Sequence, residues 1–279
     1  MRMQTSSMPG YAQAITFPDS AESPAQEPLE LHLANLYSRE LQDNPSHDYL
    51  REHSSPEHLS SHVAMFRWYW PWIEGSRSVL DWGCQHGPDS AMLRHAHNLA
   101  DTSGEVSIDG CDLADGSDHP HFRAAAQMTY RSLESIRSLP YHDGQFDAVI
   151  AAGVLEHVAS DVDSLRELHR ILQPGGRLVV TFLPNVASLD EYRLRRRGLP
   201  HHERLYSRRA TRQMLLHSGF RPLTPVFYQT PAWRRQVAQV LKAGARAEWF
   251  TRALRTLAPI HVVRASTLCV VAERASGFT

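Results

Sequence analysis

The sequence predicts an α/β fold in which a mainly parallel, doubly wound sheet is covered by helices on both faces. Short apolar segments of strand length alternate along the chain with segments whose apolar residues recur at helical spacing. The first apolar segment, Ser78–Asp81, leads through a glycine-containing turn into a helix-like segment that begins at Ser90. This strand–turn–helix unit is typical of sheets that bind nucleotides at the carboxyl ends of their strands.

The remaining elements of the core follow from the same two patterns. We expect further strands at residues 106–112, 146–152, 177–182, around 220–227 and 267–272. We expect helices at residues 90–99, 162–171, 211–218 and 233–257. Pro174-Gly175-Gly176 is expected to end the preceding helix and to turn the chain into its strand.

Three parts of the chain differ in composition. Residues 1–28 combine prolines with small polar residues and predict a flexible leader. Residues 29–75 carry apolar residues at helical intervals and predict an N-terminal cap of two or more helices, whose aromatic residues we expect mainly to pack. Residues 76–279 are expected to form the core domain, with substrate-side insertions at about 186–210 and 229–264.

Composition excludes several classes of protein. Of the 279 residues 42% are hydrophobic and 21% charged, as in an ordinary globular protein, and a net charge of −1 gives no overall attraction to nucleic acid or anionic membranes. No apolar stretch approaches the roughly 18 residues of a membrane helix. Three cysteines without a CxxC pair fit a reducing compartment. We therefore expect a cytoplasmic protein; its oligomeric state is not readable from the sequence.

The turn after the first strand carries the chemistry. Gly83 and Gly87 permit close backbone approach to a ligand, and the helix that follows offers unpaired N–H groups. The next strand ends in Asp112, whose carboxylate is placed to accept hydrogen bonds from a ribose diol, with Asp109 as the second choice. The alternative is a plain strand-to-helix turn with a surface acid that caps a loop.

A longer succession of motifs then points to one family. It comprises the run Leu139–Asp147, the strand through Gly153, Val154-Leu-Glu-His157, and Gln173-Pro-Gly-Gly176 after a helix. In these motifs the chain resembles the class I S-adenosylmethionine-dependent methyltransferases, and among them the small-molecule enzymes like those that act on ubiquinone precursors. The resemblance implies a seven-stranded Rossmann-like sheet with its last strand antiparallel, and S-adenosylmethionine as cofactor.

The resemblance also implies roles for particular residues. It places Asp81, Gly83 and Gly87 by the methionine moiety, Asp112 at the ribose, and Leu113 and Ser132-Leu133 beside adenine. The full set implied for the cofactor is Asp81, Gly83, Cys84, Gly87, Asp112, Leu113, Ser132, Leu133, Gly153 and Val154. Gln85 departs from the family pattern, which often has glycine there, and is expected to affect cofactor affinity.

Candidate catalytic bases are His157, His201 and His202. Histidine titrates near operating pH and can accept the proton of an acceptor hydroxyl, although for His157 we favour support of its loop by hydrogen bonding. The polar segment 192–206 is either a lid over an anionic or hydroxylated substrate or a solvated charged helix. We expect no metal, because none of His95-x-His97, His119-x-His121 and His201-His202 is matched by a second ligand cluster.

The expected function is O-methylation of a small-molecule acceptor. The motifs leave open N- or C-methylation, and also a binding protein that has lost turnover, which Gln85 suggests. A nucleic-acid substrate is not expected, because no Asn/Asp-Pro-Pro-Tyr/Phe run follows the fourth core strand to hold a flipped base.

Overall fold

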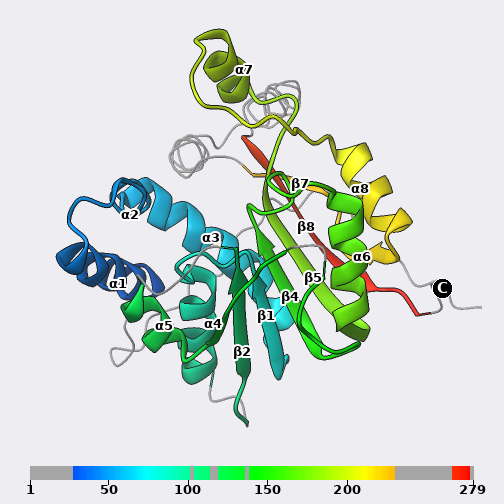
Figure 1. Cartoon of the computed structure of the whole chain (residues 1–279), viewed down its shortest axis with the longest axis horizontal. Helices are drawn as coiled ribbons and strands as arrows, with labels where there is room; N and C mark the ends of the chain where they lie inside the picture. The colour runs from blue at the N-terminus through cyan, green and yellow to red at the C-terminus, as the bar shows by residue number, and fades with distance from the viewer. Residues whose placement is uncertain (1–27, 101–103, 114–118, 136–137, 230–265, 277–279) are drawn as a thin grey trace, which may run out of the picture.

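The computed structural model describes residues 28–100, 104–113, 119–135, 138–229 and 266–276. A mixed sheet runs through its centre in the order β3-β2-β1-β4-β5-β8-β6, with the short β7 also paired to β8 (Figure 1). The strands are β1 (Ser78–Trp82), β2 (Ser107–Asp112), β3 (Thr129–Ser132), β4 (Phe146–Ala152), β5 (Leu172–Pro184), β6 (Phe220–Pro222), β7 (Phe227–Gln229) and β8 (Thr267–Arg274). The β1–β5 pairings are parallel and β8 is antiparallel to its neighbours, which confirms the predicted doubly wound sheet with its last strand antiparallel.

Helices cover both faces of this sheet. They are α1 (Leu29–Asp43), α2 (Asp48–His53), α3 (Pro56–Ile73), α4 (Pro88–Leu99), α5 (Pro120–Ala126), α6 (Asp161–Ile171), α7 (Leu189–Arg196) and α8 (Arg208–His217). In Figure 1, α6 and α8 lie over one face, and α7 stands apart at the end of the molecule where the parallel strands finish. Among the described helices, none has the length and hydropathy needed to cross a bilayer.

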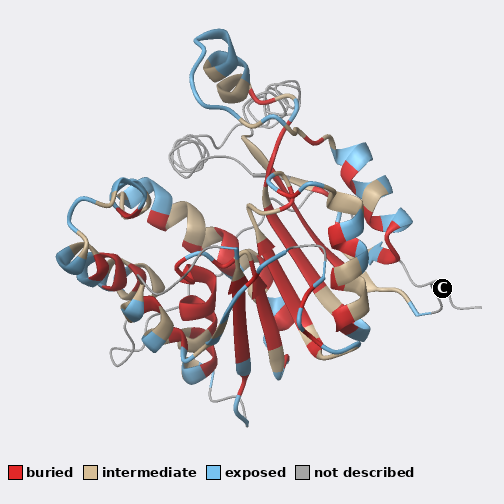
Figure 2. Cartoon of the chain, viewed as in Figure 1, coloured by how far each residue is buried: buried red, intermediate tan, exposed pale blue. Residues whose placement is uncertain are grey.

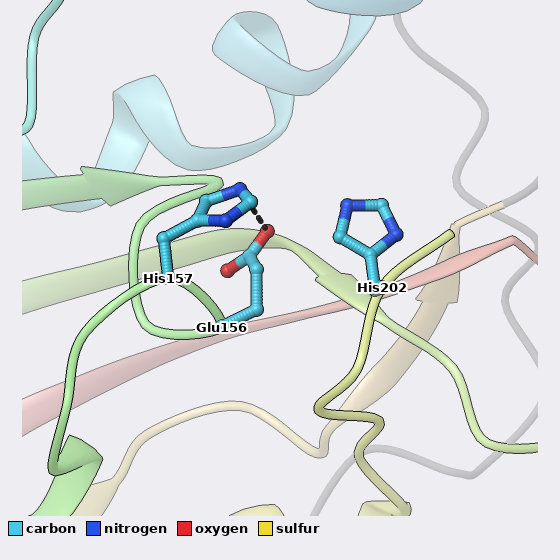
Figure 3. Close-up of side chains that lie close together, drawn as sticks. All are labelled: Glu156, His157 and His202. Atoms are coloured by element: carbon cyan, nitrogen blue, oxygen red, sulfur yellow. Dashed lines mark ion pairs between the residues drawn. The ribbon is translucent and has the colours of Figure 1, made fainter. Parts of the chain in front are cut away.

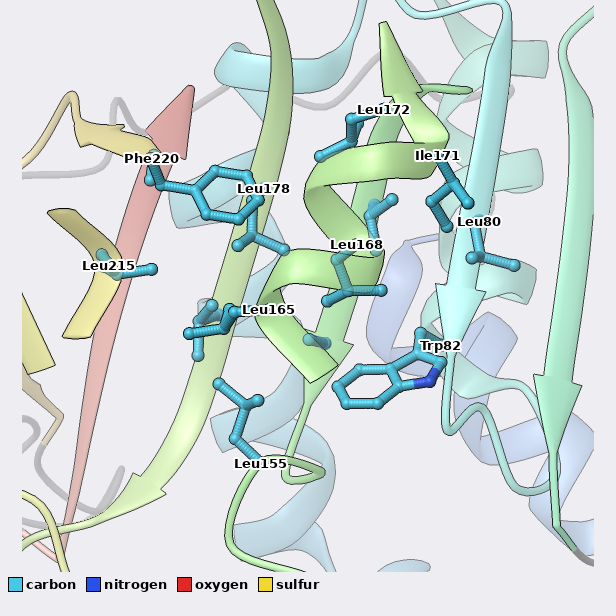
Figure 4. Packing of buried hydrophobic residues seen from close by; sticks show 14 of the residues in the cluster. Leu80, Trp82, Leu155, Leu165, Leu168, Ile171, Leu172, Leu178, Leu215 and Phe220 are labelled. Atoms are coloured by element: carbon cyan, nitrogen blue, oxygen red, sulfur yellow. The ribbon is translucent and has the colours of Figure 1, made fainter. Parts of the chain in front are cut away.

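Alternation along the strands divides the core into two clusters. Leu80 and Val149 face α6 and α8, whereas their neighbours Val79 and Ala148 face the cluster that includes α1, α3 and α4. Successive side chains of a strand point to opposite faces, so strands buried on both sides consist almost wholly of apolar residues. Figure 2 shows the central strands buried along their length, and Figure 4 shows α6 packed on the first of these clusters.

Two boundaries differ from the sequence prediction. Strand β5 begins at Leu172, directly after α6, because Leu172 pairs with Phe146 of β4 before the register shifts. Pro174-Gly175-Gly176 therefore lies within the irregular start of the strand and does not separate it from the helix. The strand expected around 220–227 is divided into β6 and β7, and the helix expected at 233–257 lies outside the described residues.

The N-terminal cap is held to the core by buried polar contacts. The carboxylate of Glu40 in α1 is buried and accepts the N–H groups of His121 and Phe122 in the first turn of α5, at 2.8 and 3.1 Å. From α3, Phe66 and Tyr69 are buried as the packing interpretation predicts, while Trp72 remains 39% exposed. The cap thus helps to fix the position of α5.

Candidate functional site

The turn between β1 and α4 takes a shape that requires left-handed backbone. Gly83 has a φ of 70°, and a Cβ there would lie 2.6 Å from a methyl carbon of Val154, so the β1 turn and the loop after β4 touch. Gln85 has a φ of 46° although it is not glycine. The left-handed conformation of Gln85 explains why the family often has glycine at this position, since left-handed backbone costs a residue with a side chain about 1–2 kcal/mol.

Gln85 connects this turn to two neighbours. Its N–H donates to Oδ2 of Asp112 at 2.9 Å, and the N–H of Leu113 donates to Oδ1 at 2.6 Å. Burial raises the pKa of Tyr49 in α2 to about 12, and a hydrogen bond with the Gln85 side chain partly opposes that rise. The residue that departs from the family pattern therefore helps to hold both the Asp112 carboxylate and the cap.

Behind the turn lies a buried polar network. Asp89 in the first turn of α4 accepts hydrogen bonds from the Tyr69 hydroxyl at 2.5 Å and binds His62 Nε2 at 2.7 Å. Asp81 at the end of β1 accepts the Ser90 hydroxyl at 2.7 Å. Burial, reinforced by the nearby charge of Asp89, raises the pKa of Asp81. An acidic group at a helix N-terminus also meets the positive end of the helix dipole.

A pocket opens between the β1 turn, the end of β2 and the loop after β4. Its walls are formed by Trp82, Gly83, Gln85, Asp112, Leu113, Leu133, Gly153, Val154, His157 and Val158. Six of the ten residues predicted to bind the cofactor are among them. Asp81, Cys84, Gly87 and Ser132 are not, and their predicted roles stay predictions.

The residues of the pocket fit S-adenosylmethionine. The Asp112 carboxylate is oriented by two backbone N–H groups at the rim, where it can accept hydrogen bonds from a ribose diol. Leu113 and Leu133 supply apolar walls suited to a purine ring. Asp109, the second choice from the sequence, lies within β2 beside Arg131 and outside the pocket lining.

Two of the three predicted bases come together, with a carboxylate between them. Figure 3 shows the Glu156 side chain between the rings of His157 and His202, with one ring nitrogen of His202 turned toward it. Glu156 Oε1 lies 4.0 Å from His157 Nε2, and the two rings are 5.7 Å apart. Burial raises the pKa of Glu156 to about 7 and lowers that of His157.

Segment 199–206 brings His202 to the loop after β4. Arg204 donates from one nitrogen to the carbonyls of Leu155 and Val158, and the Tyr206 hydroxyl also donates to Leu155. His201 does not join the cluster: its Nδ1 contacts the carbonyl oxygen of Leu199, 2.9 Å away. The predicted lid is therefore anchored at its C-terminal end to the pocket wall, while α7 within it buries no residue.

Sequence reasoning missed the residues that support the site. His62 and Tyr69 gave no signal, because a polar residue inside a helical apolar pattern does not reveal its partner. The Glu191 carboxylate binds both the ring Nδ1 and the backbone N–H of His202, yet eleven positions separate the two residues. His86 and His97 are also buried, and nothing in the sequence distinguishes them from surface histidines.

Comparison with known proteins supports the same interpretation. Residues 80–180 match a family model described as a methyltransferase domain. The chain is 33% identical to the demethylmenaquinone methyltransferase of Mycobacterium tuberculosis over 39% of its own length and 46% of that protein. The matched part of the chain thus spans a little less than half of that relative's length.

Solved structures share the fold at low identity. An S-adenosylmethionine-dependent methyltransferase from Mesorhizobium loti aligns with 77% of this chain and 98% of its own, at 21% identity and a TM-score of 0.52. The [4+2]-cyclase SpnF aligns with 79% of this chain and 83% of its own, at 20% identity and a TM-score of 0.50. The fold alone follows from these matches.

The predicted resemblance and cofactor are supported together by the domain match, the sheet order and the pocket. Residues 80–180 match a methyltransferase domain, and the chain has the fold of the class I S-adenosylmethionine-dependent methyltransferases and resembles those of quinone biosynthesis.

Proposed function

We propose that this chain transfers the methyl group of S-adenosylmethionine to a hydroxyl group of a small molecule. The observation that carries the proposal is the position of Glu156, His157 and His202 beside a pocket whose other wall holds Asp112. The cofactor supplies an activated methyl group, so the protein must align an acceptor, exclude water and accept the proton that the acceptor releases. An oxygen acceptor needs that last function most.

One end of the pocket binds the cofactor, and the other end carries the residues that accept a proton. Asp112 and the apolar side chains of Leu113 and Leu133 hold the nucleoside end of the cofactor. His157 lies in the pocket wall. Burial raises the pKa of Glu156 to about 7, and a proton acceptor works best when its pKa is near the operating pH. The named activity of the demethylmenaquinone relatives also involves a small-molecule acceptor.

Calorimetric titration with S-adenosylhomocysteine tests the cofactor half of the proposal. We expect wild-type protein to bind and Asp112→Asn to bind roughly 10- to 100-fold more weakly, because a charged acceptor is lost. Asp109→Asn is the matched control and should retain affinity. Absence of binding by folded wild-type protein would contradict the proposal.

Methyl-transfer assays with hydroxylated and amine-containing acceptors test the other half. Product from a hydroxyl acceptor that falls in His157→Ala supports O-methylation. Turnover of nitrogen or carbon acceptors alone would replace it with N- or C-methylation, and cofactor binding without transfer to any acceptor would leave a binding protein.

A further inference from the structure

We propose that Glu156, His157 and His202 bind a divalent transition-metal ion of the zinc class at the acceptor side of the pocket. The three residues each offer one ligand atom, and these atoms all lie within 4.8 Å of one another. Two imidazoles and one carboxylate form the ligand set of many catalytic zinc and iron sites. Residue spacing does not predict this ligand set, because His157 and His202 are 45 residues apart.

Glu156 provides an independent sign of a missing partner. Its side chain is only 3% exposed, and its Oε2 atom is buried with no hydrogen-bond partner among the residues that the structure describes. Burying a carboxylate without compensation costs several kcal/mol, so such groups are normally paired or coordinate metals. The charge of Arg204 lies nearby, but its guanidinium donates to the backbone carbonyls of Leu155, Val158 and Ala159.

His202 is oriented as a metal ligand would be. Its Nδ1 lies 2.7 Å from Glu191 Oε1. Since a carboxylate only accepts hydrogen bonds, the proton of the neutral ring sits on Nδ1 and the lone pair on Nε2. The nitrogen turned toward Glu156 in Figure 3 is therefore the one able to bind a cation. A carboxylate behind a ligating histidine is the usual outer support of such sites.

Binding needs only a small contraction of the cluster. Ligands about 2.1 Å from a tetrahedral ion lie about 3.4 Å apart, so the present separations must shrink by roughly 1 Å. The side chains of His157 and His202 are 67% and 38% exposed, which leaves them free to rotate and gives the ion a path from solvent. Three protein ligands leave a further coordination position open.

That the open position binds the acceptor oxygen rests on the proposed function, whereas binding of the ion itself does not. His157 also lines the cofactor pocket, so an acceptor oxygen at the open position would lie beside that pocket. A bound divalent ion lowers the pKa of an oxygen ligand strongly. In this form the ion lowers the pKa of the acceptor hydroxyl, the proton leaves to the solvent that reaches His157 and His202, and the imidazoles no longer serve as its acceptors.

Titration of the full chain with Zn²⁺, and with Co²⁺ read by its visible absorption, tests the site without cofactor or acceptor. We expect one equivalent to bind, and Glu156→Gln and His202→Ala each to weaken that binding at least tenfold. Glu191→Gln should weaken it 10- to 100-fold through loss of the outer support. His201→Ala is the matched control and should leave the affinity unchanged.

Circular dichroism confirms that each variant is folded before its affinity is compared. The proposal is overturned if wild-type protein binds no ion, or if Glu156→Gln and His202→Ala bind as tightly as His201→Ala, which would assign the ion to other histidines. Because no cofactor is present, that result is distinct from a failure of S-adenosylhomocysteine binding.

Discussion

The backbone N–H of Gln85 donates a hydrogen bond to Oδ2 of Asp112, so the residue that departs from the family pattern orients the carboxylate expected at the ribose. Gln85 achieves this with a φ of 46°. The departure thus preserves the geometry of the turn at the expense of local strain. It also places a side chain against Tyr49 of the cap.

Gln85→Val should lower the free energy of unfolding by roughly 1–2 kcal/mol, because a β-branched residue tolerates left-handed backbone poorly. Gln85→Asn is the control, since asparagine adopts this conformation readily. Urea unfolding measures both. Equal stability of the two variants would show that the turn relaxes to another conformation.

The Asp89–His62 pair should make stability depend on pH in both directions. Burial alone would lower the pKa of His62, but the charge of Asp89 and the hydrogen bond to it outweigh burial, so the pKa of His62 is raised. Burial alone would raise the pKa of Asp89, but the charge of His62 and the hydrogen bonds from His62 and Tyr69 outweigh burial, so the pKa of Asp89 is lowered. The histidine contribution is complete below its unfolded pKa of about 6.5 and is lost as pH rises through the folded pKa. The aspartate contribution is present above about pH 3.9 and is lost as pH falls through the folded pKa.

The stability difference between wild-type protein and His62→Gln should therefore be larger at pH 5.5 than at pH 8.5. Urea unfolding at the two pH values measures that difference, and His58→Gln, on the same helix, is the control. A difference that does not change with pH would mean that His62 does not gain its proton on folding.

Glu40→Ala should lower the free energy of unfolding by roughly 2 kcal/mol or more, because two N–H groups at the start of α5 lose their acceptor. Glu30→Ala, which removes a surface ion pair with Arg67, should cost less than about 1 kcal/mol. Thermal unfolding compares them. Similar costs for both variants would show that water replaces the Glu40 carboxylate.

Arg204→Ala should release the loop after β4, since its guanidinium binds three carbonyls of residues 155–159. Hydrogen exchange of that loop should become faster, because local opening costs less without these bonds. Arg195→Ala in the exposed α7 is the control. Unchanged exchange in Arg204→Ala would show that Tyr206 alone is enough to hold the loop.

Local patterns in the sequence determined most of the fold. Apolar runs such as Phe146–Ala152 are typical of strands buried on both faces, so their alternation with helical segments predicted a mainly parallel, covered sheet. Gly83 and Asp112 were candidates from the sequence, because a turn with close backbone approach and an acid at a strand tip are properties of short segments, and both line the pocket.

Only the tertiary structure decided which distant side chains meet. Glu156 and His202 lie together because Arg204 and Tyr206 bind the loop after β4, and no periodicity encodes that contact. Asp89 likewise receives His62 and Tyr69 from a helix that precedes the sheet. Secondary structure follows from the spacing of neighbouring residues, whereas these pairs depend on how packed elements bring remote parts of the chain within hydrogen-bond distance.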